Sequence, residues 1–264
     1  MIGVFDSGLG GLSVLAAIAR TLPHADLVYL ADTAHLPYGS KPDDFIRGRV
    51  LAIGRHLVAH GCTTLVAACN TATAAALQAL RHDLPGIAVV GIEPGVKPAA
   101  AASQSRHIAV LATESTANSA RLAQLIAAHA GGVTVHVESC PGWATRVETL
   151  QFDGPGASGF AAEVAAKIIP LLDAGADRIV LGCTHYAFLD ELLHPLIDGR
   201  AELVEVADAV AREVMRRAGA AAHGQGRLEL QATARPERLH AALPALHLSW
   251  LLPRLAGAAR QVRP

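Results

Sequence analysis

Short apolar runs rich in β-branched residues alternate along the chain with longer amphipathic stretches. The short runs have the length of buried strands, and they cover residues 2–5, 26–31, 64–68, 88–92, 108–112, 133–137, 178–181 and 203–206. The longer stretches have helical spacing, and they cover residues 11–22, 43–60, 71–82, 115–130, 159–174 and 187–197. Regular alternation of strand and helix is typical of βαβ units. The pattern therefore predicts an α/β fold with a mostly parallel sheet.

Residues 65–71 and 179–185 look like two copies of one element, and residues 2–8 resemble residues 108–115 more weakly. This repeat predicts two similar, doubly wound α/β domains related by pseudo-twofold symmetry, with the active site between them. A passage rich in Pro, Ala, Gly and Ser at residues 93–105 suggests a boundary. We expect one domain over residues 1–96 and 207–264, with C-terminal helices, and the other over residues 97–206.

Polar residues gather where the expected strands end, which is where parallel sheets bind ligands. They are Asp6 and Ser7, Asp32 and Thr33, Cys69 to Thr71, Thr113, and Cys183 to His185.

Two of the four cysteines share one setting, because Cys69 and Cys183 each lie between a strand end and a helix start. Helix N-termini favour thiolates, and a thiol with a pKa near 8.5 is readily tuned. Two thiols on opposite faces of a carbon could remove a proton from one face and deliver one to the other. Cys62 and Cys140 lack this setting and are expected to be small buried residues. All four are expected to be free thiols.

Four segments resemble the glutamate racemases of the aspartate/glutamate racemase superfamily: GVFDSGLGGLSV (3–14), DTAHLPYG (32–39), ACNTAT (68–73) and LGCTHY (181–186). They occur in the order of the family. The resemblance implies racemisation of L- and D-glutamate without a cofactor, which supplies D-glutamate for peptidoglycan, and thus a role in cell wall biogenesis and cell shape. Dimers are common in the family, so a homodimer is a further expectation. Aspartate racemase is the alternative within the superfamily, and a non-catalytic two-lobed binding protein the alternative outside it.

The resemblance also implies roles for individual residues. Cys69 and Cys183 match the two catalytic bases, Asp6 and His185 match the residues that assist them, and Glu148 matches an acidic residue near the second thiol. The residues that match the substrate-binding set, or that lie beside it, are Asp6, Ser7, Pro37, Tyr38, Gly39, Asn70, Thr71, Thr73, Thr113, Thr116, Thr184 and His185. From position alone, Thr73 and Thr33 could equally be helix caps, and His185 could be a hydrogen-bonded residue at a helix start.

Charge and composition narrow the classes of partner. The formal net charge is −1 and no stretch is strongly basic, which argues against a nucleic-acid partner. No apolar run reaches the roughly 18 residues that span a bilayer, and no secretion signal is evident, so a cytoplasmic protein is expected.

The sequence gives little support for a dinucleotide site, a pyridoxal phosphate site or a metal site. The glycine-rich turn at Gly8 and Gly10 has Ser13 where a dinucleotide motif needs glycine. None of the three lysines has the setting of a pyridoxal phosphate lysine, and no metal is expected. His56 and His60 are interpreted as a solvated helix face.

Overall fold

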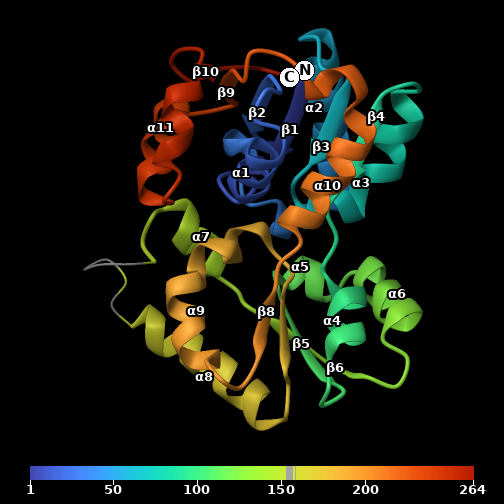
Figure 1. The fold of residues 1–264 in the computed structure, drawn as a ribbon, viewed down its shortest axis with the longest axis vertical. Coiled ribbons are helices and arrows are strands. Elements are labelled where there is room, and N and C mark those ends of the chain that lie inside the picture. The colour runs from blue at the N-terminus through green and yellow to red at the C-terminus, as the bar shows by residue number, and fades with distance from the viewer. Residues whose placement is uncertain (153–156, 158) are drawn as a thin grey trace. The chain divides into compact units, whose positions relative to one another are not determined.

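The computed structural model describes residues 1–152, 157 and 159–264 of the chain, which form two compact units (Figure 1). The first comprises Met1–Ile92 with Ala207–Pro264, and the second Glu93–Val206. Each unit has its own sheet, in which all pairs of neighbouring strands are parallel. The predicted α/β fold class is confirmed.

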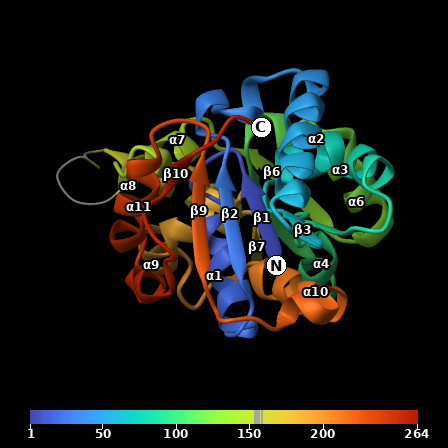
Figure 2. The same ribbon diagram turned by 90° about the horizontal axis from the view of Figure 1, so that it is seen from above.

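The sheet of the first unit has the strand order β10-β9-β2-β1-β3-β4, and Figure 2 shows β9, β2, β1 and β3 side by side. Its strands are β1 (Ile2–Asp6), β2 (Leu27–Ala31), β3 (Thr64–Ala67), β4 (Ala88–Gly91), β9 (Leu228–Ala232) and β10 (Arg260–Gln261). Its helices are α1 (Leu12–Thr21), α2 (Asp43–Ala59), α3 (Asn70–Asp83), α10 (Ala207–Ala218) and α11 (Pro236–Ala245), with the short 3-10 helices η1 (Thr33–His35), η2 (Tyr38–Ser40), η5 (Gly219–Ala222) and η6 (Ser249–Arg254).

Both faces of this first sheet are buried, as a doubly wound fold requires. Val28, Leu30 and Leu65 share a core with residues of α2 and α3. The residues that alternate with them, such as Tyr29 and Val66, are also fully buried. Helices α1 and α10 pack on each other and contact strands of this sheet.

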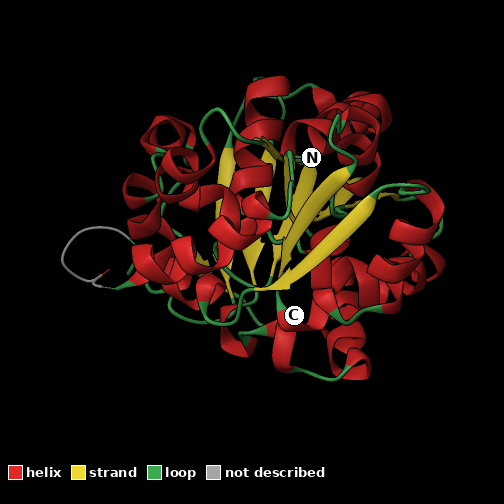
Figure 3. Ribbon diagram, turned by 90° about the horizontal axis from the view of Figure 1, so that it is seen from below, coloured by secondary structure: helices red, strands yellow, loops and turns green. Residues whose placement is uncertain are grey.

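The sheet of the second unit has the order β6-β5-β7-β8. Its strands are β5 (His107–Ala112), β6 (Thr134–Ser139), β7 (Arg178–Leu181) and β8 (Glu202–Val204). Its helices are α4 (Val96–Ala102), α5 (Glu114–Ala117), α6 (Ala120–His129), α7 (Trp143–Glu148), α8 (Phe160–Asp173), α9 (Asp190–Ile197) and the 3-10 helix η4 (Thr184–Leu189). Helices α4 and α6 lie on one side of this sheet and α8 and α9 on the other (Figure 1). Figure 3 shows the strands with their covering of helices.

The repeat in the sequence appears in the structure as a repeat of topology. Strands β2-β1-β3-β4 of one sheet correspond to β6-β5-β7-β8 of the other. Even one backbone hydrogen bond recurs: Ala68 N–H donates to the carbonyl of Phe5 at 2.8 Å, and Gly182 N–H donates to the carbonyl of Leu111 at 2.7 Å. The residue after each of these donors is a cysteine, so Cys69 and Cys183 follow equivalent strands.

Two helix predictions need correction. The helix expected at residues 115–130 is two helices, because Thr113 caps α5 and Ser119 caps α6 through side-chain oxygens that accept from Thr116 N and Leu122 N. Such caps begin a new helix by satisfying its first N–H groups. The helix expected at 187–197 starts at Asp190, because the preceding turns form η4.

The C-terminal segment holds more than the expected helices, since β9 and β10 add two strands to the first sheet. Strand β9 also corrects the interpretation of His56 and His60 as a solvated helix face. Both are half-buried, and their Nε2 atoms lie 2.8 Å from Gln231 Oε1 and 3.0 Å from Glu229 Oε2. His56 of α2 and His60, which follows its last residue, therefore join this end of the helix to a strand that the sequence pattern did not reveal.

Candidate functional site

Several of the residues predicted to form the site directly follow the central strands of each sheet. In the first sheet β1 is flanked by β2 and β3, and in the second β5 is flanked by β6 and β7. At the carboxyl end of such a central strand, the chain connections on its two sides run in opposite directions. Open α/β sheets bind ligands at this point. Asp6 and Cys69 lie at this point in the first unit, and Thr113 and Cys183 lie at it in the second.

The turn after β1 is organised by the buried carboxylate of Asp6. Its Oδ2 accepts from Gly11 N at 2.8 Å and from Gly8 N at 3.4 Å. Tyr29 on β2 donates its hydroxyl to the Gly8 carbonyl at 2.6 Å. These bonds fix the course of a turn that also carries Ser7, which is buried.

Substitution of Gly11 should disrupt this turn. A Cβ at Gly11 would lie 2.6 Å from Asp6 Cβ and 2.9 Å from Tyr29 Oη, which is overpacking of a kind that costs about 1–3 kcal/mol. Gly11→Ala should therefore lower the free energy of unfolding by that amount in urea titrations. Gly48→Ala is the control, because Gly48 lies exposed in α2 with nothing within 4 Å of its Cβ position. It should raise stability by up to about 1 kcal/mol, and equal effects of the two changes would contradict this account.

Cys69 is the N-cap of α3. Its Sγ accepts from Ala72 N at 3.5 Å, so the thiol lies against the first backbone N–H groups of a helix, where negative charge is favoured. Asn70 and Thr71 in the first turn are buried. Thr73 donates its hydroxyl to the Ala67 carbonyl and accepts from Ile92 N, both at 3.2 Å. Its contacts in the structure are thus those of a residue that joins β3, α3 and the end of β4.

The environment of Cys183 differs from that of Cys69, because a histidine lies next to its thiol and a carboxylate lies next to that histidine. Its Sγ lies 3.5 Å from His185 Nδ1, and His185 Nε2 lies 2.5 Å from Glu148 Oε1. Cys183 and His185 are nearly inaccessible. Glu148 comes from the end of α7, which is held by the buried Trp143 packed edge-on against Tyr186 of η4. The structure therefore joins three of the predicted residues into one Cys-His-Glu chain.

The proton on His185 is held tightly. Burial opposes the charged ring, but the negative charge of Cys183 and hydrogen bonds to Cys183 and Glu148 outweigh it and raise the pKa of His185 well above its ordinary value of 6.5. A protonated ring can donate to a thiolate on one side and to the Glu148 carboxylate on the other.

This raised pKa predicts a pH-dependent contribution to stability. The folded state binds the His185 proton more tightly than the unfolded chain, so the contribution is fully present below about pH 6.5 and is lost as pH rises through the folded-state pKa. In urea titrations at a series of pH values, the stability difference between the wild type and His185→Gln should shrink as pH rises above about 6.5. A difference that is constant or grows over this range would contradict the assignment.

Cys62 and Cys140 are buried thiols in apolar surroundings. Burial raises the pKa of Cys62 to about 11 and that of Cys140 to about 12. Both therefore stay protonated near neutral pH, as expected of structural cysteines. None of the four cysteines, all of which the structure describes, forms a disulfide.

The remaining predicted residues lie in three places. Tyr38 and Gly39 belong to η2, directly after Pro37, and the Tyr38 hydroxyl donates to Asp32 Oδ2 at 2.7 Å. Thr113 and Thr116 bond each other through their hydroxyls at 3.1 Å. Thr184, which opens η4, is buried. Two supporting residues were not among the predicted ones, Tyr29 and Arg49. Tyr29 lies in an apolar strand and Arg49 in an amphipathic helix, and neither sequence context indicates a functional residue.

Two kinds of feature are absent from the described part of the chain. Within residues 1–152, 157 and 159–264, no three His, Cys, Asp or Glu side chains come together in a way that could hold a metal ion. None of the helices described combines the length and the apolar character needed to cross a membrane.

The chain is similar in sequence to proteins of one known family. Residues 2–214 match the sequence model of the family described as Asp/Glu/Hydantoin racemase. A glutamate racemase from Cupriavidus pinatubonensis is 46% identical over 82% of this chain and 78% of its own length, and one from Pseudomonas aeruginosa is 42% identical over 97% and 96%.

A solved structure of comparable fold is the Escherichia coli glutamate racemase in complex with L-glutamate and the activator UDP-MurNAc-Ala. It is 28% identical, with a TM-score of 0.82 over 99% of this chain and 97% of that one. The chain therefore belongs to the Asp/Glu/Hydantoin racemase family and, within it, to the glutamate racemases, which are isomerases.

Proposed function

We propose that the enzyme interconverts L- and D-glutamate without a cofactor, by transfer of the α-proton between two cysteines. The observation that carries the proposal is the equivalence of Cys69 and Cys183, two buried cysteines outside any disulfide that follow corresponding strands in the four-stranded part common to the two sheets. We propose further that the two domains expected from the sequence, residues 1–96 with 207–264 and residues 97–206, contribute one thiol each.

In this mechanism one thiolate removes the α-proton and the other thiol protonates the opposite face. The reverse reaction exchanges the two roles. Breaking the Cα–H bond leaves an electron pair delocalised into the α-carboxylate, so the negative charge must be stabilised by oriented donors. The hydroxyl, amide and backbone N–H groups at the strand ends, including those of Ser7, Asn70 and Thr184, are suited to bind the two carboxylates of glutamate.

The two thiols are assisted in different ways. Cys69 relies on the N-terminus of α3. We propose that the Asp6 carboxylate, at the end of the neighbouring strand, assists proton transfer or meets the substrate ammonium. Cys183 relies on His185, whose proton stabilises the thiolate and which Glu148 orients. We propose a cytoplasmic enzyme that supplies D-glutamate for peptidoglycan, and we expect a homodimer.

Rates measured on both enantiomers of glutamate and aspartate, with no cofactor added, test this function. Glutamate should be racemised in both directions to an equal mixture. Aspartate should react with a kcat/KM about 10- to 200-fold lower, because a pocket fitted to the longer side chain loses one methylene's contacts. Hydroxylamine, which removes pyridoxal phosphate, should leave the rate unchanged. A preference for aspartate would make the enzyme an aspartate racemase, and binding without racemisation would leave only a binding protein.

A further inference from the structure

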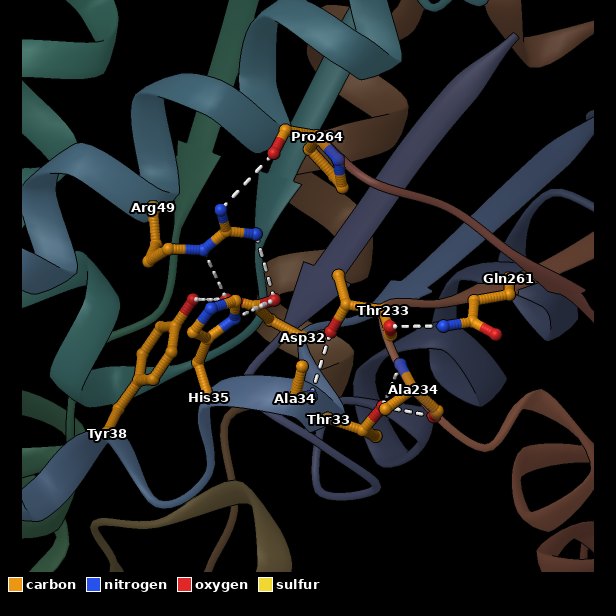
Figure 4. Close-up of polar contacts among 10 residues, drawn as sticks. All are labelled: Asp32, Thr33, Ala34, His35, Tyr38, Arg49, Thr233, Ala234, Gln261 and Pro264. Atoms are coloured by element: carbon orange, nitrogen blue, oxygen red, sulfur yellow. Dashed lines mark hydrogen bonds and ion pairs between the residues drawn. The ribbon is translucent and has the colours of Figure 1, made fainter.

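A fully buried carboxylate, Asp32, lies at the end of β2 and gathers three side chains (Figure 4). Arg49 on α2 donates from Nε to Oδ2 and from Nη2 to Oδ1, both at 3.0 Å. The Tyr38 hydroxyl donates to Oδ2 at 2.7 Å, and His35 Nδ1 lies 2.9 Å from Oδ1. The carboxylate thus connects a helix with the loop that carries the predicted substrate-binding residues Pro37 to Gly39.

Arg49 is the charged partner that makes this arrangement stable. A carboxylate buried without a partner is costly, whereas a two-point guanidinium contact fixes both its charge and its orientation. Burial alone would raise the pKa of Asp32, but hydrogen bonds from Arg49, Tyr38 and His35 and the charge of Arg49 lower it. The third guanidinium nitrogen of Arg49 donates to the Pro264 carbonyl at 3.2 Å. Arg49 is therefore itself held on two sides.

Tyr38 is the link from this ion pair to the candidate site. Only 2% of it is exposed, and it packs in the same buried cluster as Cys69. Burial and the neighbouring charge of Asp32 raise the pKa of Tyr38, so its hydroxyl stays a donor. Tyr38 is the first residue of η2 and Gly39 is the next, so an anchored Tyr38 side chain lies directly beside the predicted substrate-binding residue Gly39.

The start of the same loop is held by the segment that follows β9. The Thr33 hydroxyl donates to the Ala234 carbonyl at 2.5 Å, and Ala34 N donates to Thr233 Oγ1 at 2.9 Å (Figure 4). Gln261 of β10 in turn donates to the Thr233 carbonyl at 3.2 Å. The start of the loop is thus fixed by the segment after β9, and Tyr38 further along is fixed by Asp32, which Arg49 holds.

We propose that Arg49 is a positioning residue for racemisation, because its two-point contact with Asp32 holds Tyr38 and the loop at residues 37–39 in place beside Cys69. The inference rests on the proposed function, in which this loop binds substrate. Arg49 itself touches no reacting atom. Its loss should remove the two-point contact that fixes the orientation of the Asp32 carboxylate, and the loop should then lose the fixed acceptor that orients it.

The kinetic test compares two arginines of the same helix. Arg49→Met should lower kcat/KM for glutamate about 10- to 100-fold, mainly through KM, because small displacements of a binding group have effects of this size. Arg55→Met is the matched control, since Arg55 lies exposed on α2 and pairs with Asp83 at the surface. The control should keep wild-type kinetics. Added guanidinium should restore part of the activity of Arg49→Ala, and added ammonium should not.

A second readout follows Tyr38 directly and does not depend on activity. The chain has three tyrosines, so 3-fluorotyrosine labelling gives three fluorine resonances, and Tyr38→Phe identifies the one in question. Arg49→Met should shift or broaden this resonance and leave those of Tyr29 and Tyr186 in place. Arg49→Lys, which keeps the charge but loses the two-point contact, should show smaller changes of the same kind, and it serves if the methionine variant does not fold.

The outcomes separate the inference from the function on which it rests. A wild-type enzyme that does not racemise glutamate overturns the proposed function. If the wild type is active but Arg49→Met behaves like Arg55→Met, the positioning role is overturned. An unchanged Tyr38 resonance overturns it as well, and so does a shifted resonance with unchanged kinetics.

Discussion

Replacement of either Cys69 or Cys183 by alanine should lower kcat/KM for glutamate racemisation by about three to four orders of magnitude. In the proposed mechanism each thiol is the general base in one direction and the general acid in the other, and removal of such a group typically costs up to about 10⁴-fold. Enantiomers have equal free energies in water, so the loss in kcat/KM must be the same in both directions. Coupled-enzyme assays or circular dichroism at the glutamate band measure it.

The remaining thiol gives each variant a distinct signature. With Cys69 absent, Cys183 can still remove the α-proton of the enantiomer that faces it and return a solvent proton to the same face. The two variants should therefore exchange the α-proton of opposite enantiomers without inversion. Cys62→Ala and Cys140→Ala are the controls, because both thiols are buried and kept protonated, and both variants should remain active. Exchange of the same enantiomer by both catalytic variants would show that the thiols act on one face, contrary to the proposal.

Loss of His185 should have the second largest effect. His185→Gln removes the proton donor beside Cys183, so the thiolate loses its stabilising charge and kcat/KM should fall about 10²- to 10³-fold at neutral pH. Part of the activity should return at higher pH, where hydroxide deprotonates the thiol without help. Glu148→Gln should cause a smaller loss, since the ring keeps a hydrogen-bond acceptor and loses only the charge behind it.

The control for His185 is another histidine paired with a carboxylate. His194 lies exposed on α9, 3.1 Å from Asp190 Oδ1, and His194→Gln should leave the pH profile unchanged. Substrate deuterated at Cα gives a further check, because the primary isotope effect in His185→Gln should increase mainly in the direction in which Cys183 removes the proton. Equal changes in both directions, or an unshifted pH profile, would contradict a specific role beside Cys183.

The central features of the fold could be predicted because they are local or repeated. Eight short apolar runs gave the strands β1 to β8 to within a few residues, and the duplicated segment indicated two sheets of one topology. The position of Cys69 and Cys183 at strand ends followed from the same pattern. That they act as the catalytic pair stays a proposal.

The features that were missed depend on contacts between distant segments. Strand β9 alternates Leu228, Leu230 and Ala232 with Glu229 and Gln231. This signal is short, and the pairing of β9 with β2 spans about 200 residues. His56 and His60 acquire partners only because that pairing occurs. Arg49 likewise resembles any surface arginine of an amphipathic helix, and only the fold places it on Asp32. The sequence pattern therefore predicted strands β1 to β8, whereas β9, β10 and the side-chain networks that support the site required the structure.

The most direct test of the two-thiol mechanism is the position of deuterium during the first turnovers in D₂O, with no cofactor added. The thiols of the free enzyme exchange with solvent, so each inversion should deliver a deuteron. Starting from either enantiomer, the account predicts that the product carries one α-deuterium while the unreacted substrate keeps its hydrogen. Product that retains the α-hydrogen would contradict the account. Substrate that gains deuterium as fast as product forms would do the same, because it would show that one group acts on both faces.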